Sequence, residues 1–196
     1  MRALWAAVVV VLTAATSSAE AQEALTLTVR PSHFDALSAA ARERQARLEV
    51  PRHDTGAWSL YSATTGAESD LGYHRLVRDF LRNLCARIGT EPYCGTEKRF
   101  TSYLYEPPRL RFTGRQKAGA ATFALSKISC VTLTVERGGQ VVTSVSRVLG
   151  RGTKQLFWRV PRKGKFVVRV VAQDLMGRRA ETETTVTAKV TPVVKR

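Results

Sequence analysis

The sequence has little that could hold a metal ion or carry redox chemistry. It contains only three cysteines and three histidines, and their spacing resembles no zinc site. It also lacks the glycine-rich loops that bind phosphates or dinucleotides, and the turn that presents the serine of a hydrolase. We therefore expect no protein metal site and no cofactor.

Apolar runs are equally scarce, and the one long run stands near the first residue. Arg2 is followed by an apolar run over residues 3–15 and then by Ala19-Glu20-Ala21, which together form the pattern of a secretory signal peptide over residues 1–21. A retained membrane anchor is the alternative, although the run is short for crossing a bilayer. No second run of that length follows, so we expect a secreted, extracytoplasmic chain with no stable membrane span.

Acidic residues are rare in one half of the chain only. Residues 1–106 carry 12 Lys+Arg and 12 Asp+Glu, whereas residues 107–196 carry 19 and 4. Such a break in composition predicts a domain boundary, and Pro107-Pro108 marks it because paired prolines end helices and stiffen linkers. The expected parts are a helical segment over residues 22–106, a β domain over residues 109–190 and a tail over residues 191–196.

Apolar periodicity predicts the helices of the first part. Residues 72–88 carry apolar side chains at the i, i+3, i+4 and i+7 positions, and Gly89 stands where a helix-ending glycine belongs. Residues 32–49 predict a second helix with a thinner apolar stripe, and residues 96–104 predict a shorter third one. Residues 24–30 alternate in polarity, as a strand does.

The three cysteines predict one disulfide. A pair is expected in an oxidising compartment, and Cys85 and Cys94 are nine residues apart with Gly89 and Pro92 between them to turn the chain. Cys130 is left over in an alternating run, where we expect it to be a small, buried, apolar residue.

After Pro108 the sequence changes to seven short strand-like runs separated by glycine turns. Seven such runs in about 85 residues predict a β-sandwich of the immunoglobulin or fibronectin-III type. The stretch from Phe157 to Arg178 resembles the end of the Ig-like modules found on secreted bacterial proteins. We therefore predict an α+β chain in two parts, a small α-helical segment followed by an all-β Ig-like sandwich.

Residues 54–74 combine aromatic rings with a polar setting and form the candidate site. Tyr61 precedes a polar loop and Tyr73 begins the helix that follows it, so a loop that folds back would bring both phenols to one pocket. Packing is the alternative for the rings, because Tyr73 lies on the apolar stripe of its helix and Trp58 is a large apolar residue. The alternative for His74 is a solvated side chain or a partner for Asp70.

Four features follow one another between residues 34 and 107. They are D-T-G-A-W-S-L-Y over residues 54–61, Y-H at residues 73–74, the amphipathic helix that begins there, and R-F-x-S-Y over residues 99–103. In this order they resemble the C-terminal segment of the D-glucuronyl C5-epimerase family. The resemblance implies an isomerase, a carbohydrate epimerase that inverts C5 of glucuronate residues in a polysaccharide and so forms iduronate.

The resemblance also implies roles for individual residues. Tyr61 and Tyr73 would be catalytic, with one phenol removing the C5 proton and the other returning a proton to the opposite face. The residues expected to bind the substrate are Trp58, His74, Arg75 and Arg78. The two arginines enter because the family's arginine after the first tyrosine is missing, and the substrate carboxylate needs a cation.

The implied fold is part of an α/α-toroid domain, whose cleft in the family also uses residues upstream of this segment. Little chain precedes Asp54 after the predicted cleavage site. The catalytic domain would therefore be incomplete, unless a partner chain or a homo-oligomer completes it. The implied partner is a polysaccharide that contains uronic acid.

A second hypothesis, from a different class, is a non-catalytic binding module. A segment with 19 basic and 4 acidic residues attracts polyanions through counterion release and long-range steering. Given the export signal, we expect an acidic polysaccharide or a cell-wall polymer and no nucleic acid. The alternative is a spacer whose arginines merely keep it in solution.

Overall fold

The structure, a computed structural model, describes residues 39–189. The chain divides into two units, Met1–Glu43 and Arg44–Arg196, and all contacts discussed below lie within the second. The predicted signal peptide, the predicted strand over residues 24–30 and the tail over residues 191–196 lie outside the described residues.

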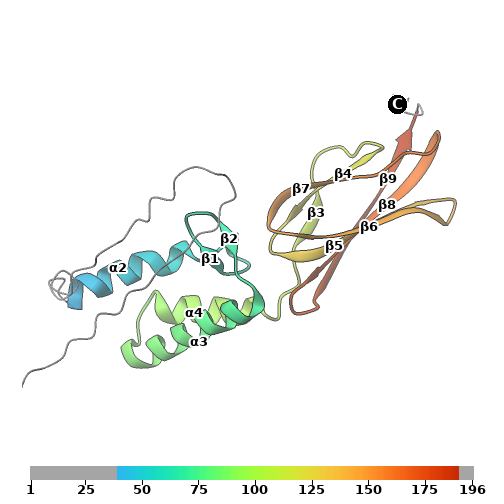
Figure 1. Ribbon diagram of the computed structural model, residues 1–196. Helices are drawn as coiled ribbons and strands as arrows, with labels where there is room; N and C mark the ends of the chain where they lie inside the picture. The colour runs from blue at the N-terminus through green and yellow to red at the C-terminus, as the bar shows by residue number, and fades with distance from the viewer. Residues whose placement is uncertain (1–38, 190–196) are drawn as a thin grey trace, which may run out of the picture. The chain divides into compact units, whose positions relative to one another are not determined.

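Three helices and a hairpin form the first half of the described chain (Figure 1). The helices are α2 (Ala39–Arg52), α3 (Leu71–Ile88) and α4 (Tyr93–Tyr103). A short antiparallel hairpin of β1 (Leu60–Ser62) and β2 (Ala67–Glu68) connects α2 to α3. The predicted helix over residues 72–88 is confirmed almost residue for residue.

Local signals set the ends of α3. Asp70 caps its first turn, because a side-chain oxygen of Asp70 accepts a hydrogen bond from the backbone N–H of Tyr73 at 2.7 Å. Gly89 ends the helix in the left-handed region at φ 69°, a conformation that glycine adopts without steric cost. The predicted disulfide between Cys85 and Cys94 is confirmed, and it ties the end of α3 to the start of α4.

Seven strands form the second half, and each overlaps one of the seven predicted strand-like runs to within two residues at its start. They are β3 (Leu110–Phe112), β4 (Ala120–Leu125), β5 (Ser129–Arg137), β6 (Gln140–Leu149), β7 (Gly152–Phe157), β8 (Gly164–Asp174) and β9 (Arg179–Ala188). All neighbours pair antiparallel, in a three-stranded sheet of order β3-β4-β7 and a four-stranded sheet of order β6-β5-β8-β9.

The two larger sheets share one hydrophobic core. Alternate residues along the strands are buried, as in β4, where Ala121, Phe123 and Leu125 point inward. Cys130 contradicts its prediction, because the side chain is exposed. Its neighbour Val131 occupies the inward position, so the alternation turns Cys130 outward.

The predicted fold class is wrong. Of residues 39–189, 42% are strand and 28% helix, in three short helices and three sheets, and this part of the chain shows neither a clear α/α-toroid nor a clear Ig-like arrangement. The described part of the helical segment contains three helices, too few to close a toroid, and β1 and β2 interrupt it. Strand-like runs predict the strands themselves, whereas the class of a β fold depends on which strands pair, and that information is not local.

A buried cation joins the helical segment to the sheets. Lys127, between β4 and β5, is 1% exposed and forms a 2.7 Å salt bridge with Asp174 at the end of β8. Its ammonium also donates to the backbone carbonyls of Tyr103 at 2.8 Å and Glu106 at 2.6 Å. All three N–H groups of the lysine therefore have acceptors, and the contact connects α4, the linker and the β8–β9 turn.

A carboxylate makes a second connection between the same parts. Glu68 of β2 accepts the backbone N–H of Ile128 at 2.9 Å and that of Arg151 at 2.6 Å. Because both donors belong to loops of the sheets, Glu68 holds the small hairpin against them.

Candidate functional site

The structure brings the two predicted catalytic tyrosines together. The rings of Tyr61 and Tyr73 meet edge to face, with their centroids 4.9 Å apart. Tyr61 is 61% exposed on β1, and Tyr73 is half-buried in the first turn of α3. The ring contact leaves no room for a sugar between the two rings in this conformation.

Trp58 and His74, two of the predicted substrate-binding residues, are instead core residues. Trp58 is 1% exposed and His74 is 0% exposed. Their rings stack in parallel with centroids 3.8 Å apart, and the indole N–H of Trp58 donates to the carbonyl of Ser69 at 2.8 Å. Neither ring can reach a ligand at the surface, so the packing alternative holds for Trp58.

His74 belongs to a buried polar network. Its Nδ1 lies 2.8 Å from Ser59 Oγ, its Nε2 lies 2.9 Å from the carbonyl oxygen of Phe100, and Ser59 Oγ is hydrogen-bonded to Ser69 Oγ at 2.9 Å. Burial lowers the pKa of His74 from 6.5 to about 4, so the ring is neutral near pH 7. A carbonyl only accepts, so Nε2 carries the proton of the neutral ring and donates it to the Phe100 carbonyl.

Asp54 is a second centre of contacts in the same segment. Its carboxylate forms a 2.6 Å ion pair with Arg99 and accepts the phenol of Tyr103 at 2.9 Å. It also accepts the backbone N–H of Gly56 at 2.8 Å, which shapes the turn before Trp58. Burial, followed by the bond to Asp54, raises the pKa of Tyr103 to about 12, and the same carboxylate raises the pKa of Arg99.

The structure does not place the predicted arginines beside the tyrosines. Successive helix residues are about 100° apart, so Arg75 and Arg78 lie roughly 200° and 140° from Tyr73 around the α3 axis. The guanidinium of Arg78 pairs with Asp79 at 2.7 Å. Arg75 is exposed and contacts the sulfur of Met176 at 3.5 Å.

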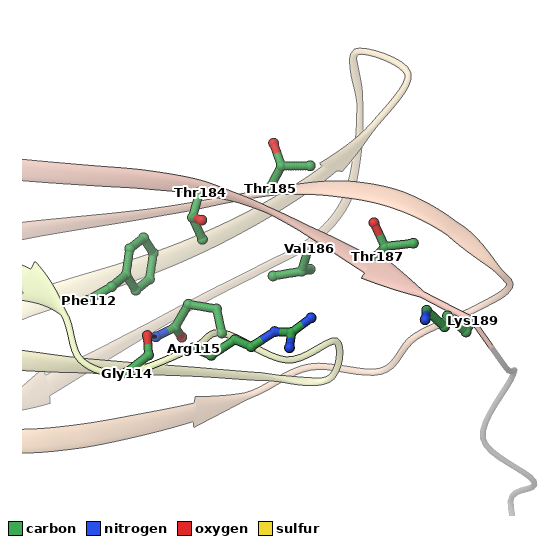
Figure 2. Close-up of a pocket in the computed structure, with 9 residues that line it drawn as sticks. Phe112, Gly114, Arg115, Thr184, Thr185, Val186, Thr187 and Lys189 are labelled. Carbon is green, nitrogen blue, oxygen red and sulfur yellow. Dashed lines mark hydrogen bonds between the residues drawn. The ribbon is translucent and has the colours of Figure 1, made fainter.

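A pocket of about 440 Å³ lies far from these residues, beside the last part of β9. Figure 2 shows the residues that line it, among them Phe112, Gly114 and Arg115 and, from β9, Thr184, Thr185, Val186 and Thr187. None of the residues predicted as a site lines it. Within residues 39–189, no cluster of three or more His, Cys, Asp or Glu is placed to hold a metal ion. No helix of that range is long and apolar enough to cross a membrane.

Sequence reasoning missed the buried pair of Lys127 and Asp174. A lysine between two strand-like runs carries no local signal of burial, because its partner is 47 residues away in the sequence. The exposure of Phe157 was predictable from the sequence. Residues of a strand alternate between its two faces, and Leu156 and Trp158 on either side of Phe157 are both buried.

Comparisons with known proteins identify no family. No protein-family model and no curated protein matches the chain. Among solved structures, the chain is similar to a double mutant of an endo-β-1,4-mannanase from Cellulomonas fimi, with 13% identity and a TM-score of 0.31. The match covers 46% of this chain and 25% of the mannanase chain, and a similarity this weak carries no argument.

Proposed function

We propose that the chain is a secreted module that binds acidic polysaccharide through the positive charge of its two larger sheets. The observation that carries the proposal is the distribution of charge. Residues 107–196 hold 19 basic and 4 acidic residues, and one of the four, Asp174, is already neutralised inside the protein by Lys127. The surface around the sheets is therefore strongly cationic and suits a polyanion.

Salt is the sharpest test of this proposal. The full chain should be retained on an immobilised uronic-acid polysaccharide, and it should elute as the salt concentration rises, because each neutralised anion releases a counterion. An uncharged polysaccharide on the same support is the control and should not retain the chain. Retention that does not change with salt, or equal retention on both supports, would contradict the proposal.

A second candidate function is C5 epimerisation of glucuronate in such a polysaccharide. The observation that favours it is the contact between the exposed Tyr61 and the half-buried Tyr73, two phenols from separate elements. One phenolate would take the C5 proton, the electron pair would pass into the sugar carboxyl group as an enolate, and the other phenol would return a proton to the opposite face. The exposed side chain of Tyr61 would have to rotate away from Tyr73 to admit the sugar.

Deuterium exchange tests the second candidate directly. The chain would be incubated with a glucuronate polysaccharide in heavy water, and C5 would be examined by NMR. Incorporation that disappears in Tyr61→Phe/Tyr73→Phe supports the tyrosine mechanism. The exposed Tyr105→Phe is the matched control and should leave incorporation unchanged. Binding without incorporation would leave the binding function alone.

A further inference from the structure

The acidic residues among residues 107–196 all lie on one of the two larger sheets. They are Glu136 on β5, Asp174 on β8, and Glu181 and Glu183 on β9. Within the four-stranded sheet, Glu181 and Glu183 form ion pairs with Arg169 at 3.2 and 2.9 Å. The three-stranded sheet carries no acidic residue on its strands, so the charge on its outer side is entirely positive.

The pairing register fixes which side chains share that outer side. In β4 the inward residues alternate with Ala120, Thr122 and Ala124, so these three point outward. Their direct partners on the neighbouring strands point the same way. Arg111 and Thr153 flank Ala124, Gln155 is opposite Thr122, and Lys117 and Phe157 flank Ala120.

We call this surface the basic face. It consists of Arg111, Lys117, Thr122, Thr153, Gln155 and Phe157, together with Arg159, which is exposed and continues the alternation of β7. The 3.2 Å hydrogen bond from the Gln155 side-chain amide to Thr122 Oγ1 agrees with their shared side.

The spacing of the basic face suits an extended ligand. Same-side residues along a strand are about 6.7 Å apart and neighbouring strands about 4.8 Å apart. Arg111 therefore lies roughly 13 Å from Lys117 along the sheet, and Phe157 lies about 10 Å from Lys117 across it. The central strand contributes only small side chains, so a chain can lie flat between charges that are too far apart for one small anion.

Phe157 adds an apolar element to this charged surface. Its ring is 68% exposed, although the neighbouring outward positions are polar or small. An aromatic ring offers a flat apolar surface, which matches the C–H face of a pyranose ring and has no counterpart in an inorganic polyanion. Hydroxyl and amide groups at Thr122 and Gln155 can serve as partners for sugar hydroxyls.

We propose that the basic face is where an acidic polysaccharide lies, with Phe157 stacked on a sugar ring and the cations paired with its carboxylate or sulfate groups. This inference rests on the proposed binding function and assigns it to one surface. It also assigns the ligand class, since stacking distinguishes a charged sugar polymer from a polyanion without sugar.

The first experiment separates this face from general charge. Binding of the full chain to polygalacturonate is measured by calorimetry at several salt concentrations, for wild type, Arg111→Gln/Arg159→Gln and Lys165→Gln/Arg179→Gln. The second pair is the control, because both residues are exposed on strands of the four-stranded sheet. Loss of two contacts should reduce affinity about tenfold near 0.1 M salt and make the log–log salt slope shallower by about 1.5. The control should change affinity less than about twofold.

The second experiment tests the ligand class. Phe157→Ala should weaken binding to polygalacturonate by about 2- to 12-fold and leave binding to inorganic polyphosphate unchanged. Phe80→Ala, which removes a ring 61% exposed on α3, should change neither. Circular dichroism of each variant verifies the fold before binding is compared.

The outcomes distinguish the two levels of the proposal. If both charge pairs weaken binding equally, the basic face is refuted while charge-driven binding stands. If Phe157→Ala leaves polygalacturonate binding unchanged, or weakens both polymers equally, the assignment to sugar stacking is refuted. If wild type binds neither polymer, the proposed function itself fails.

Discussion

Replacing Lys127 with methionine should destabilise the protein more than any surface substitution. The lysine is 1% exposed and its ammonium has three acceptors: Asp174 at 2.7 Å and the carbonyls of Tyr103 and Glu106. Methionine fills a similar volume but donates nothing. Lys127→Met therefore leaves a buried carboxylate and two carbonyls without their partner.

The size of the loss follows from burial. Removing one member of a buried ion pair costs about 3–5 kcal/mol, because the remaining charge is left unpaired in a medium of low polarity. Asp174 keeps the backbone N–H groups of Met176 and Arg178 at 2.9 and 2.8 Å, which favours the lower half of that range. For a chain of this size, about 3–4 kcal/mol corresponds to a fall in Tm of about 6–16 °C.

Chemical denaturation with two probes measures both the loss and its location. Trp58 belongs to the core of the helical segment, and its ring centroid lies 5.4 Å from the Lys127 ammonium. Trp158 reports on the core between the two larger sheets. Variants in which Trp58 or Trp158 is the single tryptophan, with Trp5 also replaced, give separate transitions. In Lys127→Met the midpoint at Trp58 should fall at least as far as that at Trp158, because the lost contacts include α4 and the linker.

Matched variants make this prediction refutable. Lys165→Met removes an exposed lysine of β8 and should change the free energy of unfolding by less than about 0.5 kcal/mol. Lys127→Met/Asp174→Asn should lose less stability than the sum of the single variants, because it leaves no charge unpaired. A cost below about 1 kcal/mol for Lys127→Met, or strict additivity in the cycle, would refute the reasoning.

Three further predictions concern stability. His74 has a pKa of about 4 when folded, against 6.5 in the unfolded chain, so the unfolded state binds the proton first. The stability that the neutral, buried His74 contributes is therefore complete above pH 6.5. The free energy of unfolding falls by about 3 kcal/mol as the pH drops toward 4. Urea titrations should show that slope, and His74→Gln should remove it; an unchanged slope would contradict the assignment. Trp58→Phe should cost about 1–3 kcal/mol more than Trp158→Phe, since the Trp58 indole N–H has an acceptor and that of Trp158 has none among residues 39–189. Equal costs by thermal denaturation would count against this. Opening the Cys85–Cys94 bond should cost about 2.5 kcal/mol, the loop-closure value for so short a loop, which a Cys85→Ser/Cys94→Ser variant would measure; no loss of stability would refute it.

Local patterns were sufficient for α3 and for the seven strands after Pro108, whereas they did not predict the hairpin of β1 and β2. The stripe of residues 72–88, with Asp70 before it and Gly89 after it, contains everything that defines α3. The seven strands after Pro108 likewise follow from alternation and glycine turns. The same patterns do not say that β4 pairs with β7 while β5 lies between β6 and β8. That choice depends on long-range packing of the core, which is why the strands were predicted correctly and the fold class was not.

The site shows the same division. The sequence placed Tyr61 and Tyr73 at the two ends of a polar loop, and their contact agrees with that expectation. The sequence did not show that the His74 side chain is buried, because a polar residue type in the first turn of a helix is expected to face solvent. Its burial depends on acceptors and donors supplied by Ser59 and Phe100, which come from other elements.

The residues that carry the epimerase resemblance contact one another. Asp54 from the first match holds Arg99 and Tyr103 from the last, while Trp58 stacks on His74. A shared folding requirement is therefore sufficient to explain why these residue types occur in this order.

The tyrosine pair is different, because Tyr61 stands exposed and neither phenol forms a hydrogen bond within residues 39–189. Catalysis, if the chain performs it, has to depend on these two side chains and not on the buried network. Tyr61→Phe/Tyr73→Phe should then abolish deuterium incorporation at C5 while the free energy of unfolding stays within about 0.5 kcal/mol of wild type. Trp58→Phe should instead lower stability, with incorporation per folded molecule preserved. The opposite pattern would place the chemistry in the core and refute this separation of folding from function.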